Sequence, residues 1–157
     1  MGIFSSKKNK THTIIIGCGR LGANLANTLS EEDENVLIMD KDKDAFRKLP
    51  LSYGGLTLTG DGTDFDALQE AQIACADVVI VVTNNDNTNV MIAQIAHEVY
   101  HVKRVIARLY DPERECIYQE FGIDTICPAV LSDKEIDALL TKIPATVKKF
   151  EFTEETK

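Results

Sequence analysis

Short, almost continuously apolar runs alternate with amphipathic stretches along this chain. The apolar runs predict six β-strands, at Thr13–Ile16, Asn35–Met39, Leu56–Leu58, Val78–Val82, Val102–Ile106 and Asp124–Ile126. The amphipathic stretches predict helices at Leu21–Ser30, Asp42–Leu49, Asp64–Ala71, Asn87–Val99, Pro112–Phe121 and Asp133–Leu140. Several strands are apolar on both faces, which is typical of parallel strands covered by helices on both sides. The alternation predicts an α/β fold: a Rossmann-like, doubly wound sheet of six parallel strands in a single domain.

Two of the predicted helices have recognisable start signals. Asp111 before Pro112 is typical of an N-cap with proline at the first helical position. Ser132 and Glu135 fit a capping box, which predicts that the last helix begins just after Ser132. The regular pattern ends at Lys142. We therefore expect a flexible tail over residues 1–10, one folded domain over residues 11–142 and a second tail over residues 143–157.

Composition narrows the classes of function. The 157 residues suffice for one domain with a sizeable core, but not for a cofactor domain and a typical substrate domain together. The net charge of -8 argues against a nucleic-acid partner, which selects for a basic face. No run of about 18 apolar residues would span a bilayer and no signal peptide is recognisable, so we expect no direct membrane insertion.

The cysteines form no C-x-x-C pair. Their wide spacing predicts reduced, mostly buried thiols of a cytosolic protein rather than a disulfide framework. The four residues are Cys18, Cys75, Cys116 and Cys127. Cys18 lies inside the glycine-rich loop after the first strand, where a helix N-terminus can lower a thiol pKa, but packing beside the strand is the favoured interpretation.

The first strand runs directly into Gly17-x-Gly19-x-x-Gly22, and the first helix begins there. In this context Gly17 permits a tight turn, Gly19 lets a pyrophosphate approach the main chain, and Gly22 lets the helix pack closely on the sheet. Amides at the helix N-terminus would then face the phosphates. Arg20 is a cation that opposes the helix dipole, so its position favours a nearby phosphate over a purely structural role.

The second strand ends in Asp40, 18 positions after Gly22. A carboxylate at this point accepts hydrogen bonds from both ribose hydroxyls and repels a 2′-phosphate, so it favours NAD or an adenosine nucleotide over NADP. By itself Asp40 also suits an ordinary turn at a strand end. The glycines, the strand and the spacing together predict a nucleotide site.

Further polar residues follow the third and fourth strands. Gly60-Asp61-Gly62 predicts a tight turn in which Asp61 could accept a hydrogen bond from an adenine amino group. In the same loop, Thr63 could instead cap the next helix. The fourth strand is followed by Thr83, Asn84, Asn85 and Asp86. Polar groups in this position line the nucleotide crevice of such folds, although they also suit turns and helix caps.

Together these segments resemble a known family. In chain order, GCGRLG, the strand-end Asp40, GDGTD, VTNNDNTNVMIAQIA and VIARLYDPE…FGIDTICP are similar to the motifs of the TrkA-N domain. That domain is the N-terminal lobe of the RCK (KTN) domains, which regulate potassium channels and transporters. The resemblance covers about Thr11 to Leu140. The glycine pattern is shared by many Rossmann proteins, whereas the GD motif followed by T-x-x-D-x-x-N and ARxxDP is much more specific.

The resemblance implies a role for each matching position. Gly17, Gly19, Arg20 and Gly22 would hold the phosphates, Asp40 the ribose, Asp61 and Gly62 the adenine, while Thr83, Asn84 and Asp86 would border the nucleotide. Arg108 matches an arginine that reaches the phosphate side, although a solvated charge at a strand end is the alternative. With their neighbours Cys18, Leu21, Lys41 and Gly60, these residues form the predicted binding set. The implied ligand is NAD(H) or an adenine nucleotide (ATP, ADP or AMP).

Two features bear on metal binding. Some relatives use an acidic residue, placed after the proline that follows the last strand, in an intersubunit cation site. Ala129 stands there, so we expect no such metal site. His97 to His101 match the zinc motif H-E-x-x-H, but the fifth strand begins almost at once, which places His101 at or beyond the helix end and disfavours zinc hydrolysis.

The resemblance implies a non-enzymatic regulatory subunit whose nucleotide gates potassium transport. We expect it in the cytoplasm, at the inner face of the membrane, held there by a channel or transporter subunit, and as a homo-oligomer of two or more copies. RCK proteins usually continue into a second lobe, and this chain ends at Lys157, so it resembles a stand-alone N-lobe. The alternatives are a small NAD-dependent oxidoreductase, which needs a substrate pocket and usually a proton donor, and a nucleotide-binding subunit of an unrelated complex.

Overall fold

The computed structural model describes residues 10–142. Its strands are β1 (His12–Ile16), β2 (Asn35–Asp40), β3 (Leu56–Thr59), β4 (Val78–Val81), β5 (Arg104–Arg108) and β6 (Asp124–Ile126). Its α-helices are α1 (Arg20–Glu31), α2 (Phe65–Glu70), α3 (Asp86–Gln94), α4 (Glu115–Glu120) and α5 (Pro128–Thr141). Shorter turns are the 3₁₀ helices η1 (Lys43–Lys48), η2 (Ile73–Cys75) and η4 (Pro112–Arg114), and the π-helical η3 (Ile95–Val99). The tails predicted at 1–10 and 143–157 lie, apart from Lys10, outside the described residues.

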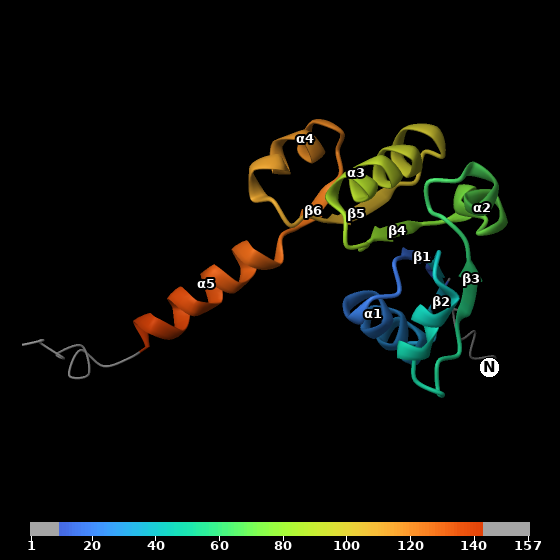
Figure 1. Ribbon diagram of the computed structural model, residues 1–157, viewed down its shortest axis with the longest axis horizontal. Helices are drawn as coiled ribbons and strands as arrows, with labels where there is room; N and C mark the ends of the chain where they lie inside the picture. Colours follow the sequence, from blue (N-terminus) through green and yellow to red (C-terminus); the bar gives the residue numbers. More distant parts are fainter. Residues whose placement is uncertain (1–9, 143–157) are drawn as a thin grey trace, which may run out of the picture.

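All six strands pair in parallel in the order β3-β2-β1-β4-β5-β6, which confirms the predicted doubly wound sheet (Figure 1). From β1 the chain builds outward through β2 to β3, and then returns to the centre to build outward through β4 to β6. The carboxyl ends of β1 and β4 therefore meet where the direction of building reverses. In open α/β sheets this switch point is where ligands bind.

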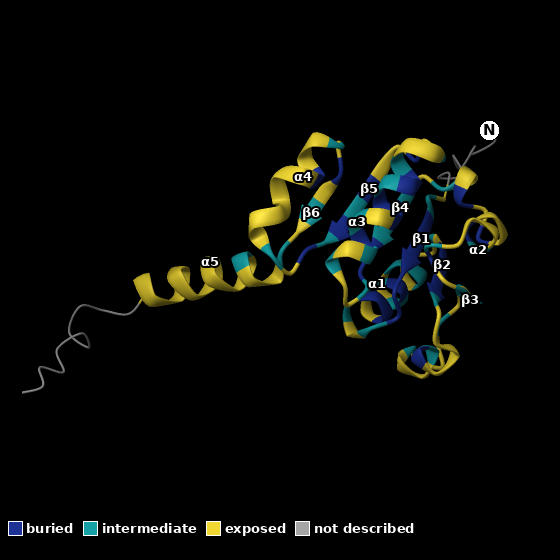
Figure 2. Cartoon of the chain, turned by 45° about the horizontal axis from the view of Figure 1, so that its top comes forward, coloured by how far each residue is buried: buried dark blue, intermediate teal, exposed yellow. Residues whose placement is uncertain are grey.

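Side chains of β1 alternate between the two faces of the sheet, as strand geometry requires. Ile14 and Ile16 pack in a core that also contains Leu68 of α2 and Ile92 of α3. On the other face, Ile15 packs in a smaller core with side chains of α1 and η1. The central strands are consequently buried on both sides (Figure 2), which explains why their sequences are continuously apolar.

The predicted start of the last helix was wrong. Helix α5 begins at Pro128, with Cys127 as its N-cap, because proline suits the first helical position. Ser132 is already inside the helix and its hydroxyl donates to the carbonyl oxygen of Pro128 at 2.8 Å, so it caps nothing. The cap at Asp111 is confirmed, since its carboxylate accepts from the main-chain N–H of Glu113 at 3.0 Å.

Helix α5 extends away from the sheet, and none of its residues is buried (Figures 1 and 2). Its large exposed apolar side chains are Leu131, Ile136, Leu139 and Leu140. Within residues 10–142, no helix combines the length and the apolar character needed to cross a membrane.

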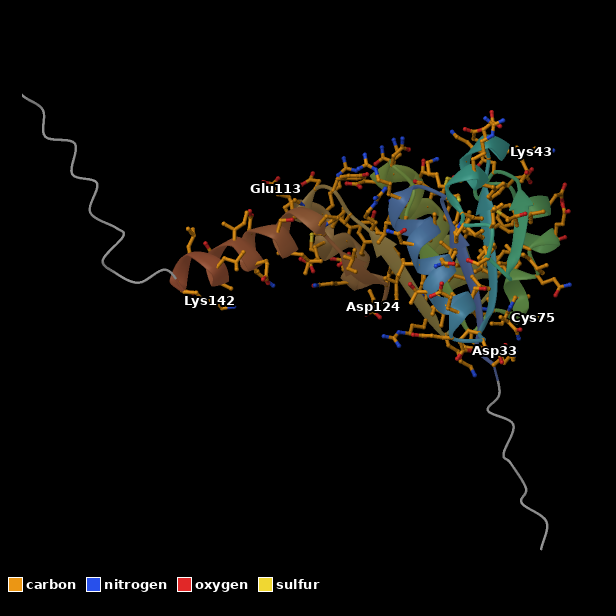
Figure 3. The ribbon with its side chains drawn as sticks, turned by 90° about the horizontal axis from the view of Figure 1, so that it is seen from below. Asp33, Lys43, Cys75, Glu113, Asp124 and Lys142 are labelled. Carbon is orange, nitrogen blue, oxygen red and sulfur yellow. The ribbon has the colours of Figure 1, made fainter. Side chains whose placement is uncertain are left out.

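The expectation of mostly buried cysteines was also wrong, although all four are free thiols. Cys18 alone is buried, whereas Cys127 is half-buried. Cys75 lies on η2 at the periphery of the molecule (Figure 3) and Cys116 lies on α4. Both helical segments are short and cover the sheet with only one side, so side chains on their other side face solvent.

Candidate nucleotide-binding site

A cleft of about 580 Å³ opens at the carboxyl edge of the sheet. Its walls come from the ends of four neighbouring strands, β2, β1, β4 and β5, and from the loop after β3. Eleven of the predicted residues line it: Gly17, Cys18, Gly19, Asp40, Lys41, Gly60, Asp61, Gly62, Thr83, Asn84 and Arg108. The topology thus brings together residues that are separated by up to 91 positions in the sequence (108 − 17 = 91).

Two glycines at the turn from β1 into α1 are required by geometry. Gly17 has a φ of +109°, a backbone conformation that residues with a side chain rarely adopt. Its N–H donates to the carbonyl oxygen of Met39 at 2.8 Å. A Cβ on Gly22 would overlap the carbonyl oxygen of Gly17, because α1 passes directly against the turn. Both expected structural roles are confirmed.

The N-terminus of α1 points its free amides toward the glycine loop. The first intrahelical bond runs from the N–H of Ala23 to the carbonyl oxygen of Gly19 at 2.9 Å, so the N–H groups of residues 20–22 precede it. A Cβ on Gly19 would meet no atom within 4 Å, which leaves room for a ligand beside the main chain. Such a helix end attracts anions. The side chain of Arg20 is exposed, and Arg20, Leu21 and Gly22 are not among the lining residues.

Asp40, the last residue of β2, forms the neighbouring wall. Its Oδ2 accepts from the main-chain N–H of Cys18 at 2.7 Å, and its Oδ1 accepts from the N–H of Asp42 at 2.9 Å. An ionised carboxylate has about four acceptor positions, so these two bonds leave others for a ligand. Asp40 therefore holds the glycine loop against β2 while it lines the cleft.

Cys18 packs beneath this wall with no exposed surface, and its thiol donates to the carbonyl oxygen of Ala45 at 3.4 Å. Burial raises the pKa of the Cys18 thiol, and the negative charge of Asp40 raises it further. The thiol is therefore neutral, which supports the packing interpretation over a reactive one.

Asp61 is held by its own loop. Its Oδ1 accepts from the main-chain N–H of Thr63 at 2.9 Å and from the Thr63 hydroxyl at 2.8 Å. The main-chain bond and then the hydroxyl bond lower the pKa of Asp61, so the carboxylate stays ionised. The possible helix cap at Thr63 was wrong by one position, since Asp64 caps α2 by accepting from the N–H of Asp66 at 2.9 Å.

Arg108 closes the far end of the cleft as the last residue of β5. Its Nη2 donates to the carbonyl oxygen of Thr83 at 2.7 Å, and its guanidinium carbon lies 4.7 Å from the centre of the Tyr110 ring. Stacking on an aromatic face stabilises a cation. The positive side chain is therefore held among residues of the cleft instead of extending freely into solvent.

Asp86 does not line the cleft. Its carboxylate accepts from the main-chain N–H groups of Tyr110 at 2.9 Å and Asp111 at 3.0 Å, and its carbonyl oxygen accepts from the Tyr118 hydroxyl at 3.0 Å. The structure therefore places Asp86 in a junction between the start of α3 and the segment after β5.

Several lining residues were not predicted. They are Ile16, Asp42, Ala45, Lys48, Thr63, Val82, Thr88 and Ile92, whereas Asn85 was expected at this edge of the sheet but was left out of the predicted binding set. Lys48 and Ala45 belong to η1, which follows the strand end at Asp40, so their proximity to the cleft is a consequence of chain order. Asn89, the asparagine of the T-x-x-D-x-x-N motif, lies beneath the cleft and is fully buried, and no role was predicted for it.

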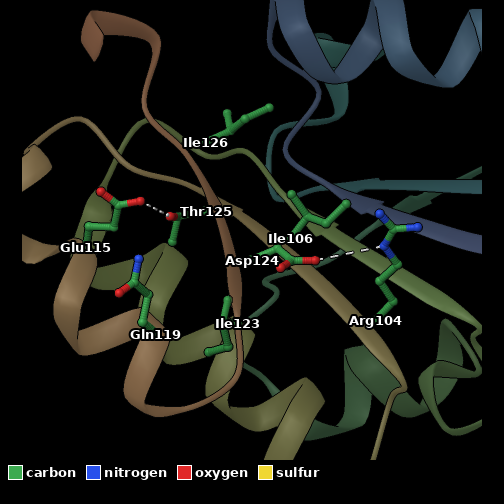
Figure 4. A pocket seen from close by; sticks show the side chains of 8 residues that line it. All are labelled: Arg104, Ile106, Glu115, Gln119, Ile123, Asp124, Thr125 and Ile126. Carbon is green, nitrogen blue, oxygen red and sulfur yellow. Dashed lines mark hydrogen bonds and ion pairs between the residues drawn. The ribbon is translucent and has the colours of Figure 1, made fainter. Parts of the chain in front are cut away.

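A second hollow of about 500 Å³ lies between α4 and the outer strands β5 and β6 (Figure 4). Two pairs of its polar side chains interact: the Thr125 hydroxyl donates to Glu115 at 3.3 Å, and Arg104 lies 3.9 Å from Asp124. Arg104 is the first residue of β5 and Arg108 the last, so this hollow is separate from the cleft.

The H-E-x-x-H stretch does not assemble a metal site. Nδ1 of His97 lies 2.8 Å from a carboxylate oxygen of Glu98, while His101 follows the helix with a φ of +54°. The prediction that His101 lies beyond the helix end is confirmed. Among residues 10–142, no group of three or more His, Cys, Asp and Glu side chains is arranged to hold a metal ion.

The parallel sheet and the cleft at its switch point define a Rossmann-like α/β domain, a class that binds nucleotides at this edge. The sequence profile of the TrkA-N domain matches residues 13–128, well over half of the chain. The chain therefore belongs to the TrkA-N family, which confirms the resemblance seen in its motifs.

The proteins to which this chain is similar are consistent with membership of the TrkA-N family. The chain is 43% identical over 115 residues to the Trk system potassium uptake protein TrkA of Streptomyces coelicolor, covering 73% of this chain and 52% of that protein. It is 30% identical over 132 residues to a TrkA homologue of Methanothermobacter thermautotrophicus, covering 83% and 61%. The chain thus spans between half and two thirds of the length of these relatives. Among solved structures, GsuK bound to ADP superimposes with a TM-score of 0.70 at 25% identity, covering 83% of this chain and 34% of GsuK.

Proposed function

We propose that this domain binds NAD(H) or an adenine nucleotide in the cleft and thereby regulates potassium transport. The observation that carries the proposal is the convergence of the glycine loop, the free amides of α1 and the Asp40 carboxylate on one cleft at the switch point. Membership of the TrkA-N family supports it, as do relatives named for potassium uptake and a similar structure, GsuK, that holds ADP.

Each end of the cleft suits one part of such a ligand. The Asp40 carboxylate accepts from the ribose hydroxyls, and its charge repels a 2′-phosphate, so NAD is preferred to NADP. The amides of residues 20–22 then meet the phosphates at the positive end of α1. Arg108 lies further along the same edge, past β4, where a terminal phosphate or the second half of a dinucleotide would extend.

Regulation follows from differential affinity, because a ligand shifts a protein only as far as it favours one conformation. The partner is a membrane potassium channel or transporter subunit, and the domain works as a homo-oligomer at the inner face of the membrane. A binding role rather than catalysis is supported by membership of the TrkA-N family and by relatives named for potassium uptake.

Isothermal titration of the full chain with AMP, ADP, ATP, NAD⁺ and NADH tests the binding step. We expect saturable binding of at least one of them, and weaker binding by Asp40→Ala. The regulatory step is tested by potassium flux through a reconstituted Trk-type transporter with and without the domain and its ligand. Absence of affinity for every compound would refute the proposal. Binding without any effect on flux would refute the regulatory part alone.

A further inference from the structure

Beneath the cleft lies a buried side chain amide whose hydrogen bonds join the ends of two strands. Asn89 of α3 has no exposed surface. Its Oδ1 accepts from the main-chain N–H of Thr83 at 3.0 Å and from the Thr83 hydroxyl at 2.5 Å. Its Nδ2 donates to the carbonyl oxygens of Thr83 at 3.2 Å and Arg108 at 2.9 Å. The orientation of the amide is fixed, because the N–H of Thr83 can only face an acceptor.

These bonds determine where the guanidinium of Arg108 lies. Asn89 holds the main chain of Arg108 directly, and it also holds the Thr83 carbonyl to which Nη2 of Arg108 donates at 2.7 Å. Thr83 has its N–H, hydroxyl and carbonyl all engaged in this arrangement. Within the described residues, Nε of Arg108 is buried without a hydrogen-bond partner. Arg108 also lines the cleft, and its single hydrogen bond from Nη2 leaves other guanidinium N–H groups as donors for a ligand there.

We propose that Asn89 is a positioning residue for nucleotide phosphates: it fixes Arg108 at the end of the cleft, through the Thr83 carbonyl and the Arg108 main chain, so that the guanidinium meets the phosphate group farthest from the adenosine. This inference rests on the proposed function. It adds that Asn89 determines how strongly the cleft prefers ligands that carry phosphate groups over ligands that carry none. Asp40, at the adenosine end, lies on β2, whereas the groups that Asn89 bonds lie at the ends of β4 and β5, on the other side of β1, so we expect the adenosine end to be independent of Asn89.

The amide is chemically matched to this task. It presents one acceptor to two donors of Thr83 and two N–H groups to two carbonyl oxygens. An aspartate of nearly the same shape keeps the acceptor but places a second oxygen against those carbonyls. A serine is smaller and retains only one hydroxyl. Either substitution therefore loosens the strand ends that carry Arg108 while it leaves the apolar core in place.

Affinities for ADP and for adenosine, measured by NMR titration on the full chain, separate positioning from general stability. For Asn89→Asp we expect ADP to bind about tenfold or more weakly, the loss typical of a hydrogen bond to a charged group, while adenosine affinity changes by less than about threefold. Asn89→Ser should show the same selective loss, and it replaces Asn89→Asp if circular dichroism finds that variant unfolded. Asn87→Ser is the matched control, because Asn87 lies on the same helix, is exposed and does not line the cleft.

A double-mutant cycle with Arg108→Leu identifies the route. If Asn89 acts through Arg108, the second substitution adds little to the loss of ADP affinity caused by the first. Equal losses for ADP and adenosine, or additive losses in the cycle, would overturn the inference while the proposed function stands. If the wild-type chain binds neither compound nor any other adenine nucleotide, the proposed function fails and this inference fails with it.

Discussion

The Asp40 carboxylate and the Cys18 main-chain N–H lie 2.7 Å apart, so the end of β2 is tied to the glycine loop on β1. Asp40, which we expect to accept hydrogen bonds from a ribose, therefore also holds the glycine loop that we expect to bind the phosphates. A second bond, from the N–H of Asp42 to the same carboxylate, fixes the side chain from the other direction. The side chain is thereby held in place before any ligand binds, and such preorganisation favours affinity.

Substitutions of Asp40 should separate its two roles. Asp40→Asn keeps an acceptor for the N–H of Cys18 but loses the charge, so we expect NAD⁺ to bind about tenfold more weakly and NADP⁺ to bind relatively better. Asp40→Ala removes both roles and should bind NAD⁺ more weakly still. Calorimetric titration of both variants checks the order. Equal affinities of Asp40→Ala and the wild type would contradict the assignment.

Gly19 and Gly22, at the turn from β1 into α1, should differ in how much stability they lose on substitution by alanine. Gly22→Ala forces a methyl group against the Gly17 carbonyl, so we expect a loss of about 2 kcal/mol or more in the free energy of unfolding, measured with urea. Gly19→Ala places its methyl group in open space and should cost about 1 kcal/mol or less. That methyl group nevertheless occupies the approach to the main chain, so nucleotide affinity should fall. A stable Gly22→Ala variant would show that α1 can shift.

Cysteine reactivity should follow burial. The raised pKa of Cys18 keeps its thiol protonated through neutral pH and makes it a poor nucleophile, whereas Cys75 and Cys116 are exposed. With iodoacetamide near neutral pH, mass spectrometry should find Cys75 and Cys116 modified first. Modification of Cys18 should require raised pH, because burial and the negative charge of Asp40 shift the formation of its thiolate to higher pH. Early modification of Cys18 in the folded chain would contradict this order.

We expect Asp86 to stabilise the fold without contributing to nucleotide affinity. Asp86→Ala removes the acceptor of two main-chain N–H groups, at Tyr110 and Asp111, so we expect a loss of about 1–3 kcal/mol in the free energy of unfolding. Because Asp86 does not line the cleft, ADP affinity of the folded variant should change by less than about threefold, within the scatter of unrelated surface changes. A large loss of affinity with unchanged stability would return Asp86 to the binding set.

The sequence predicted the sheet well because burial on both faces leaves an unmistakable apolar run, as at Ile14 to Ile16. Boundaries were less certain where two local signals compete. Pro128 and Ser132 can each begin a helix, and the chain takes the earlier signal. Thr63 and Asp64 are both good caps, and the side chain of Thr63 bonds Asp61 instead.

Within the candidate site, the features that depend on local spacing could be predicted from the sequence, whereas contacts between distant residues could not. The turn at Gly17 and the close approach at Gly22 follow from spacing alone. The pairing of Asp86 with Tyr110 spans 24 positions, and the bond from Asn89 to Arg108 spans 19. The T-x-x-D-x-x-N motif contains Thr83, Asp86 and Asn89, but its spacing does not show which groups these side chains bond, so no role was predicted for Asn89.

The bond from the N–H of Gly17 to the carbonyl of Met39 has a mechanical consequence. It prolongs the β1–β2 ladder one residue past the strand, so the first residue of the loop belongs to the same cooperative unit as the buried strands and opens only when they do. Any loop movement that lets a ligand enter or leave the cleft must therefore take place in the residues after Gly17. The rest of the glycine loop can move at the mouth of the cleft while Gly17 stays fixed to the buried strands.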